Sequence, residues 1–112
     1  MLEHLRDRIT GRAPKGARRS GDWPAARAAY LKENPQCAVC GGTARTQVHH
    51  VIPFALAPDK ELDPNNFITL CVKSDRFGKL NCHLVFGHWG NFKKCNENVK
   101  AVAAFMRASF NQ

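Results

Sequence analysis

The sequence lacks any long apolar run, which bears on whether the chain enters a membrane. None of its hydrophobic stretches approaches the roughly 18 residues that a membrane-spanning helix requires. The N-terminal stretch carries charged residues where a secretory signal peptide would be apolar. We therefore expect no membrane partner and a cytoplasmic location.

Internal repeats and extended low-complexity tracts are also missing, so one compact domain is the simplest organisation. Hydrophobic residues make up 44% of the 112 residues and charged ones 23%, the balance of an ordinary globular protein. A domain of this length buries only about two-thirds of its unfolded surface, so a cross-link in addition to the apolar core would help it fold.

Acidic residues are scarce, since nine Asp and Glu stand against seventeen Lys and Arg and give a formal charge of +8. This excess favours a polyanionic partner, and nucleic acid fits best. Residues 1–21 are basic and contain several glycines and prolines, so we expect a flexible arm that contacts DNA or is a solvated tail. Residues 22–112 would form the single domain. The cations expected to contact DNA are Arg12, Lys15, Arg18, Arg19, Lys93 and Lys94.

Two strands and a helix are expected in the first two-thirds of the chain. Asp22 can cap a helix that begins near Trp23 and ends at Asn34-Pro35. The pattern becomes β-like over Thr43–Val51, and a short apolar run at Phe67–Leu70 could pair with it.

Helices are expected in the remaining part of the chain. The apolar residues after Cys82 fit a short helix that Gly87 terminates. Asn96 can cap a C-terminal helix with Glu97 in its first turn. Helical spacing predicts one buried face for this helix, made of Val99, Val102, Ala103, Met106 and Phe110.

The five cysteines are an odd number, which argues against a fully paired disulfide framework and favours metal ligation. Cys37 and Cys40 form a knuckle of two thiolates, and the two glycines that follow let the chain turn back. Cys71 and Cys82 supply a second pair. They are far apart in the sequence for a compact knuckle, so the residues between them must form a loop that leaves the metal site and returns to it. We expect four thiolates to hold one structural Zn²⁺, with Cys95 either a competing ligand or a free thiol.

Histidine or asparagine occurs at the ends of three predicted elements. His49 and His50 follow the first strand, Asn66 begins the second, and His83 comes directly after Cys82. A frame clamped by zinc would bring these imidazoles into one cleft. A divalent ion with open positions could bind a scissile phosphate there, and a neutral histidine beside it could take a proton from the attacking water.

Spacing raises two geometric objections to such a cleft. His49 and His50 point to opposite faces of a regular strand, so the backbone must become irregular there, and Pro53 makes an early strand end plausible. His88 lies five residues after His83, roughly 140° around an ideal α-helix. We expect His88 to swing inward, to contact phosphate or to pack beside the next residue.

These motifs resemble the HNH endonuclease family over residues 37 to about 90. The matching runs are His49-His50-Val-Ile-Pro53, Asn66-Phe-Ile-Thr-Leu-Cys71 and Cys82-His83. The resemblance implies an α+β fold with a small ββα-metal (His-Me finger) core, a zinc knuckle of four cysteines and flanking helices. The run from Phe86 to Phe92 also resembles phage-associated HNH proteins, which makes phage packaging proteins candidate partners.

The same resemblance implies a role for each matching residue. His49 and His83 would be ligands of a catalytic Mg²⁺ or Mn²⁺, with His88 a further candidate. His50 would be the general base and Asn66 a structural asparagine. The structural zinc would be held by Cys37, Cys40, Cys71 and Cys82.

We therefore expect a metal-dependent endonuclease that nicks or cuts double-stranded DNA as a monomer or weak dimer. A zinc-ribbon DNA-binding module without catalysis is the main rival, and it explains the cysteines and the charge but not the histidines. A thiol–disulfide protein is a third reading of Cys37 and Cys40, but the βαβ context that such a motif requires is missing.

Overall fold

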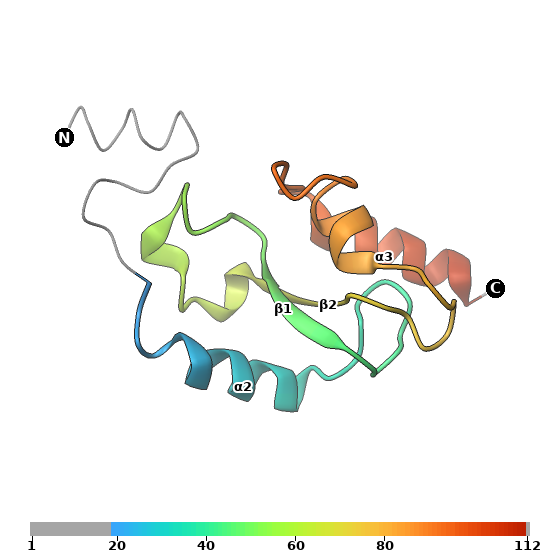
Figure 1. The fold of residues 1–112 in the computed structure, drawn as a ribbon, viewed down its shortest axis with the longest axis horizontal. Helices are drawn as coiled ribbons and strands as arrows, with labels where there is room; N and C mark the ends of the chain where they lie inside the picture. Colours follow the sequence, from blue (N-terminus) through green and yellow to red (C-terminus); the bar gives the residue numbers. More distant parts are fainter. Residues whose placement is uncertain (1–18, 112) are drawn as a thin grey trace.

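A computed structural model describes residues 19–111, and Figure 1 shows a small α+β fold built around one β-hairpin. The predicted arm residues Arg12, Lys15 and Arg18 lie outside the described residues. The elements are α2 (Trp23–Glu33), β1 (Thr46–His50), the 3₁₀ turns η1 (Pro58–Lys60) and η2 (Pro64–Asn66), β2 (Phe67–Cys71), the π-helix η3 (His83–Gly87) and α3 (Val99–Phe110).

The sheet consists of β1 and β2, paired antiparallel with Thr46 opposite Cys71 and His50 opposite Phe67. The predicted pairing of these two segments is therefore confirmed. β1 begins three residues later than predicted, because Arg45 adopts a left-handed φ of 52° in the turn that precedes it. It also ends one residue earlier than predicted.

Helix α2 starts where it was predicted to start, but its cap differs. Asp22 makes no side-chain capping bond, and its own backbone N–H donates to Ser20 Oγ instead. No residue of α2 is fully buried, so the helix is attached by its aromatic residues. The rings of Trp23 and Tyr30 both pack edge-on against Phe67, and the Tyr30 hydroxyl donates to the Phe67 carbonyl.

Helix α3 buries part of the predicted stripe. Val99 and Ala103 are fully buried against the cysteine-rich core, while the other three stripe residues are half-buried. The prediction that Asn96 caps this helix is wrong, because the helix begins at Val99 and Glu97 precedes its first turn. Asn96 is instead buried, donating to the Phe86 carbonyl and accepting from Asn98 N–H, so it ties η3 to the start of α3.

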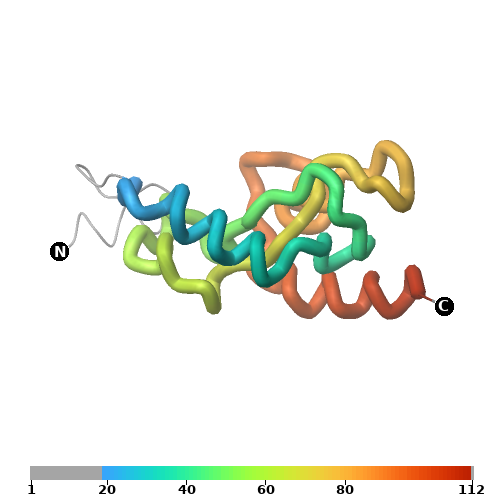
Figure 2. Tube along the Cα trace, turned by 90° about the horizontal axis from the view of Figure 1, so that it is seen from below, coloured from blue at the N-terminus to red at the C-terminus, as the bar shows by residue number. Residues whose placement is uncertain are grey.

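The hairpin lies between the two long helices, which sit toward opposite ends of the described part of the molecule (Figures 1 and 2). η3 contacts both strands and α3, so the segment after β2 folds back over the hairpin. Among the described residues, no helix is long and apolar enough to cross a membrane.

Candidate functional site

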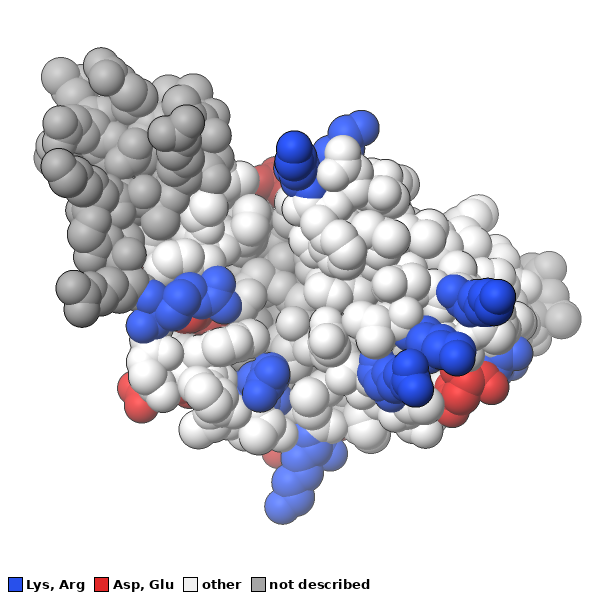
Figure 3. Space-filling model, viewed as in Figure 1, with Lys and Arg blue, Asp and Glu red and all other residues white. Residues whose placement is uncertain are grey.

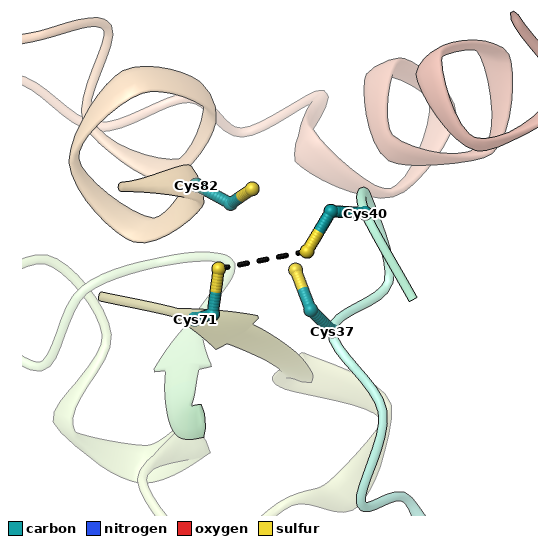
Figure 4. A group of neighbouring side chains, drawn as sticks. All are labelled: Cys37, Cys40, Cys71 and Cys82. Atoms are coloured by element: carbon teal, nitrogen blue, oxygen red, sulfur yellow. Dashed lines mark hydrogen bonds between the residues drawn. The ribbon is translucent and has the colours of Figure 1, made fainter. Parts of the chain in front are cut away.

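Four cysteines converge in the core from three parts of the chain (Figure 4). Cys37 and Cys40 come from the knuckle, Cys71 from the last position of β2, and Cys82 from the residue before η3. All four are fully buried, and their sulfur atoms lie within 4.8 Å of one another. Cys40 Sγ is 3.7 Å from Cys71 Sγ. Two thiolates at about 2.3 Å from a tetrahedral zinc ion would be about 3.8 Å apart, so the sulfur atoms fit that ion.

The knuckle turns sharply because of its local hydrogen bonds. Cys37 N–H donates to the Gly42 carbonyl, and Gly41 N–H donates back to the Cys37 carbonyl. Gly41 adopts a φ of 78°, a left-handed conformation that favours glycine. Arg107 of α3 donates to the Cys37 carbonyl, which joins the knuckle to the C-terminal helix.

Residues 72–81 form the excursion that the wide spacing of Cys71 and Cys82 requires. It returns to the cluster through Ser74, whose hydroxyl lies 3.3 Å from Cys40 Sγ and whose N–H donates to the Leu80 carbonyl. Arg76 also donates to the Cys40 carbonyl at 2.8 Å. Sequence reasoning missed both supporting residues, since nothing in the spacing indicates which polar side chains of a loop return to the core.

The charge state of the cluster also fits a divalent cation. The Cys82 thiol bonds to Cys37, which lowers the pKa of Cys37 to about 4 and raises that of Cys82. Burial raises the pKa of Cys71 to about 11. The raised pKa values therefore keep Cys71 and Cys82 protonated when no ion is bound, whereas a bound dication would stabilise their thiolates. Cys95 is not one of the four, and its thiol donates to the Val51 carbonyl.

A second cluster consists of three histidine side chains. His83 Nε2 lies 3.0 Å from His49 Nδ1 and 3.1 Å from His88 Nε2. The His88 Nδ1 atom must donate to the Lys94 carbonyl, 2.7 Å away, because a carbonyl only accepts. With its proton on Nδ1, the His88 ring directs Nε2 toward the other two rings as a possible ligand atom. A single His83 Nε2 atom cannot make a good hydrogen bond to both neighbours, whereas an ion between the rings would satisfy all three nitrogen atoms.

His88 joins this cluster because the helix before it is not an α-helix. The segment His83–Gly87 forms a π-helix and His88 follows it as a non-helical C-cap with a φ of −123°, so the 140° separation of an ideal α-helix does not apply. The His88 N–H donates to the Leu84 carbonyl, and the ring turns inward to lie 3.1 Å from His83 Nε2, which was one of the three expected positions. The predicted end of this helix at Gly87 is confirmed.

Burial keeps the His49 and His83 rings of this cluster neutral, so their nitrogens are available as ligands. Burial lowers the pKa of His49 to about 3, and a positive charge on His83 or His88 would lower it further. Burial also lowers the pKa of His83 to about 4. His49 packs against Gly87, where an added Cβ would lie 3.2 Å from its Cε1 atom. Gly87 therefore also makes room for the His49 ring.

His50 lies beside the cluster but makes different contacts. Its ring packs on Trp23 and Phe67, and its Nε2 lies 2.8 Å from the Glu61 carbonyl oxygen. That carbonyl requires a protonated Nε2, so the neutral ring keeps a lone pair on Nδ1. Burial lowers the pKa of His50 and favours this neutral form.

His49 and His50 both pair in regular register with β2, opposite Ile68 and Phe67, so the irregular backbone expected between them is not found, and their rings make different contacts. His49 and His50 line one cavity of about 320 Å³, together with His83 and His88. Figure 3 shows Lys and Arg side chains spread over the face of the molecule drawn there, with fewer acidic ones.

Asn66 fixes the backbone that follows His50. Its Oδ1 accepts from Ile52 N–H at 2.8 Å, and its Nδ2 donates to the carbonyls of Ile52 and Lys60. Its own carbonyl accepts from Val51 N–H. The side chain thus holds the loop after β1 rather than a histidine ring.

Glu61 is a site residue that sequence reasoning missed. Its side chain is only 4% exposed, and it accepts from Ser20 N–H and forms an ion pair with Arg19 at 2.7 Å. The Arg19 guanidinium lies over Phe54 and lines the cavity. A single glutamate in a loop of a basic chain carries no sequence signal that it will be buried.

The cationic residues predicted to contact DNA occupy different positions. Arg19 lines the cavity beside the histidines, and so does Arg27, which was not predicted. Lys93 and Lys94 are exposed on the loop after His88.

A family model described as HNH endonuclease matches residues 37–73. This segment, about a third of the chain, contains the first three cysteines of the cluster, His49, His50 and Asn66. The resemblance to that family is therefore confirmed for these residues. No curated protein and no solved structure matches the chain.

Proposed function

We propose that this protein, whose residues 37–73 carry the HNH endonuclease match, hydrolyses phosphodiester bonds of DNA in a metal-dependent reaction. One observation carries the proposal. Three histidine nitrogens converge in a cavity whose wall also holds a fourth histidine with a free Nδ1 lone pair. A binding module has no need of this arrangement.

His50 acts as the general base in this proposal. The Glu61 carbonyl fixes the ring with its proton on Nε2, so Nδ1 accepts the proton of an attacking water. The lowered pKa of His50 keeps the ring neutral at physiological pH. Asn66 acts as a positioning residue, because it holds the loop that follows His50.

The residues that would hold the catalytic ion are His49, His83 and His88. A bound divalent ion supplies charge to the scissile phosphate and to the leaving oxygen. Imidazole donors suit first-row transition metals, and Mn²⁺ is the weakest binder of that series, whereas Mg²⁺ prefers oxygen ligands and binds reluctantly without them. We therefore propose that Mn²⁺ supports the reaction better than Mg²⁺.

The four buried cysteines would hold a structural Zn²⁺. All four sulfur atoms are fully buried and leave no side of the cluster open to water, which is the arrangement of a closed site. The ion would join the knuckle, β2 and η3, and so keep His49 and His83 in one cavity.

The proposed substrate is double-stranded DNA, and a monomer with one such cavity would nick it. The phosphates of the DNA would be contacted by Arg19 and Arg27, which line the cavity, and by Lys94, on the loop after His88. We also propose that the protein acts in the cytoplasm as a monomer or weak dimer. Its proposed partners are phage packaging proteins. The proposal of phage packaging partners is based on the resemblance of the run from Phe86 to Phe92 to phage-associated HNH proteins.

The arm is proposed to contact DNA through Arg12, Lys15 and Arg18. Deleting residues 1–18 should weaken DNA binding and flatten its dependence on salt, because fewer counterions are released. The measurement is the slope of log affinity against log salt concentration, and an unchanged slope would leave the arm without a DNA contact.

Incubation of supercoiled plasmid with the protein tests the nuclease proposal. Relaxed or linear product should form with Mn²⁺, form more slowly with Mg²⁺ and be missing with EDTA. DNA binding without any cleavage in a series of divalent metals would instead favour a zinc-ribbon binding module.

A further inference from the structure

The loop that follows η3 exposes two large aromatic rings beside the histidine cluster. Trp89 is 53% exposed and Phe92 is 61% exposed. The Phe92 ring centroid lies 4.9 Å from that of His88 and 5.9 Å from that of His83. One side of Phe92 therefore contacts the rings that line the cavity, while much of its surface faces solvent.

The backbone of this loop is held in a defined shape. Gly90 N–H donates to the Leu84 carbonyl at 2.8 Å, and the Asn91 side chain accepts from Lys93 N–H. The Lys94 carbonyl accepts from the His88 ring. The loop backbone that carries the two rings is thus tied to the helix and to the His88 side chain.

Trp89 adopts a conformation that folding alone would not select. Its φ is +52°, a left-handed value that disfavours a bulky side chain and that glycine would adopt at less cost. The ring is also more than half exposed, so burial does not offset much of that cost. An exposed tryptophan in a strained position points to a ligand that contacts it.

The charge of the loop indicates which ligand. The exposed Lys93 and Lys94 follow Phe92 directly, and residues 83–96 contain no acidic residue. Aromatic faces combined with cations are the usual means of binding unpaired nucleotides, since each base offers a face for stacking and each phosphate attracts a lysine. In a continuous duplex both faces of a base are already stacked on its neighbours.

We propose that Trp89 and Phe92 form a stacking platform for unpaired bases next to the scissile phosphate. Within the proposed double-stranded substrate, the protein then favours a duplex with unpaired bases at the cut over a continuous duplex, and a single strand serves as the probe for the platform. This inference deepens the proposed function and rests on it for the position of the scissile phosphate, but the platform binds DNA whether or not cleavage follows.

The test is fluorescence anisotropy with a labelled single strand of about 16 nucleotides and with the matching duplex, both without added divalent metal. Phe92→Ala should weaken single-strand binding about tenfold, and duplex binding much less, because stacking on one aromatic ring is lost. Phe92→Tyr should restore the wild-type preference. Phe105→Ala is the matched control, because Phe105 is 71% exposed on α3, which does not line the cavity.

Trp89→Gly separates the platform from a role in folding. Glycine suits the left-handed backbone, so this variant should melt no lower than wild type and still lose single-strand affinity. Equal weakening of single-strand and duplex binding, or unchanged affinity in both Phe92→Ala and Trp89→Gly, would overturn the platform. A protein that cuts plasmid but shows this result refutes only the platform. A protein that binds single strands through the two rings but never cuts refutes only the nuclease.

Discussion

The Nε2 atom of His50 lies 2.8 Å from the backbone carbonyl oxygen of Glu61, and this contact determines which ring nitrogen can act as a base. Because Nε2 must donate, the lone pair is on Nδ1, and the ring lines the cavity shared with the other three histidines. A backbone carbonyl keeps its place in most side-chain variants, so the tautomer depends on the fold of the loop rather than on one side chain.

His50→Ala should lower the rate of DNA cleavage by about 10²- to 10⁴-fold, the usual contribution of a general base. DNA affinity and melting temperature should change little, because the ring is only partly buried. The measurement is plasmid cleavage under single-turnover conditions with Mn²⁺. Cleavage at the wild-type rate would remove His50 from the mechanism.

Asn66→Ala should destabilise the fold by about 2–4 kcal/mol, because three hydrogen bonds of a buried amide are lost. Chemical denaturation measures this loss. Asn65→Ala is the matched control, since the neighbouring residue is exposed. A difference of less than about 0.5 kcal/mol between the two variants would contradict the positioning role of Asn66.

Gly87→Ala should impair the histidine cluster although it replaces none of the three proposed metal ligands. The new Cβ would lie 3.1 Å from Leu70 Cδ1 and 3.2 Å from His49 Cε1, so the His49 ring must shift. We expect weaker Mn²⁺ binding in a calorimetric titration. Gly21→Ala is the control, because a Cβ there meets nothing within 4 Å. Equal Mn²⁺ affinity in both variants would show that the ring tolerates the added carbon.

Removal of the structural metal should unfold the protein. Purified protein is expected to contain one Zn²⁺ per chain, and Cys71→Ser should lose zinc and its cooperative thermal transition. Cys95→Ser should keep both, since Cys95 is not one of the clustered cysteines. Elemental analysis with thermal denaturation checks this. A Cys71→Ser variant with full zinc content would contradict the four-thiolate site.

Protonation of His49 at acidic pH should lower the free energy of unfolding. The folded-state pKa of His49 is lowered to about 3 from the ordinary 6.5, so the unfolded chain binds the proton first as the pH falls. The stability that His49 contributes is therefore present above about pH 6.5 and is lost as the pH falls from there toward 3. The loss per residue is at most about 1.4 kcal/mol for each pH unit.

The variant His49→Gln tests that assignment by comparison of denaturation between pH 7 and pH 5. Glutamine does not titrate, so the variant should show a shallower loss of stability than the wild-type protein. The four-cysteine cluster is the same in both proteins and cancels in the comparison. Parallel curves would show that His49 does not carry the pH dependence.

Much of the site could be predicted because its residues lie in short motifs with strong local constraints. The Cys37–Cys40 knuckle and the Phe67–Leu70 strand needed only spacing and alternation, and both were placed correctly. The convergence of His49 and His83 followed from the assumption that the cysteines hold the hairpin and η3 together.

Other parts of the site depend on tertiary contacts that no local pattern encodes. The position of the His88 ring is one, since helical periodicity alone would turn it away from His83, whereas it contacts His83 Nε2 and the Lys94 carbonyl. Asn96 matched the sequence pattern of a helix cap, yet its bonds join two elements. The burial of Glu61 depends on Arg19 and Ser20, about forty residues away in the sequence.

The most direct test of the central claim is a crystal of the protein grown with Mn²⁺ and measured at a wavelength where manganese scatters anomalously. The account predicts an anomalous peak between His49 Nδ1, His83 Nε2 and His88 Nε2, in the cavity that His50 also lines. A manganese peak elsewhere, with these three nitrogens bonded only to one another, would contradict it.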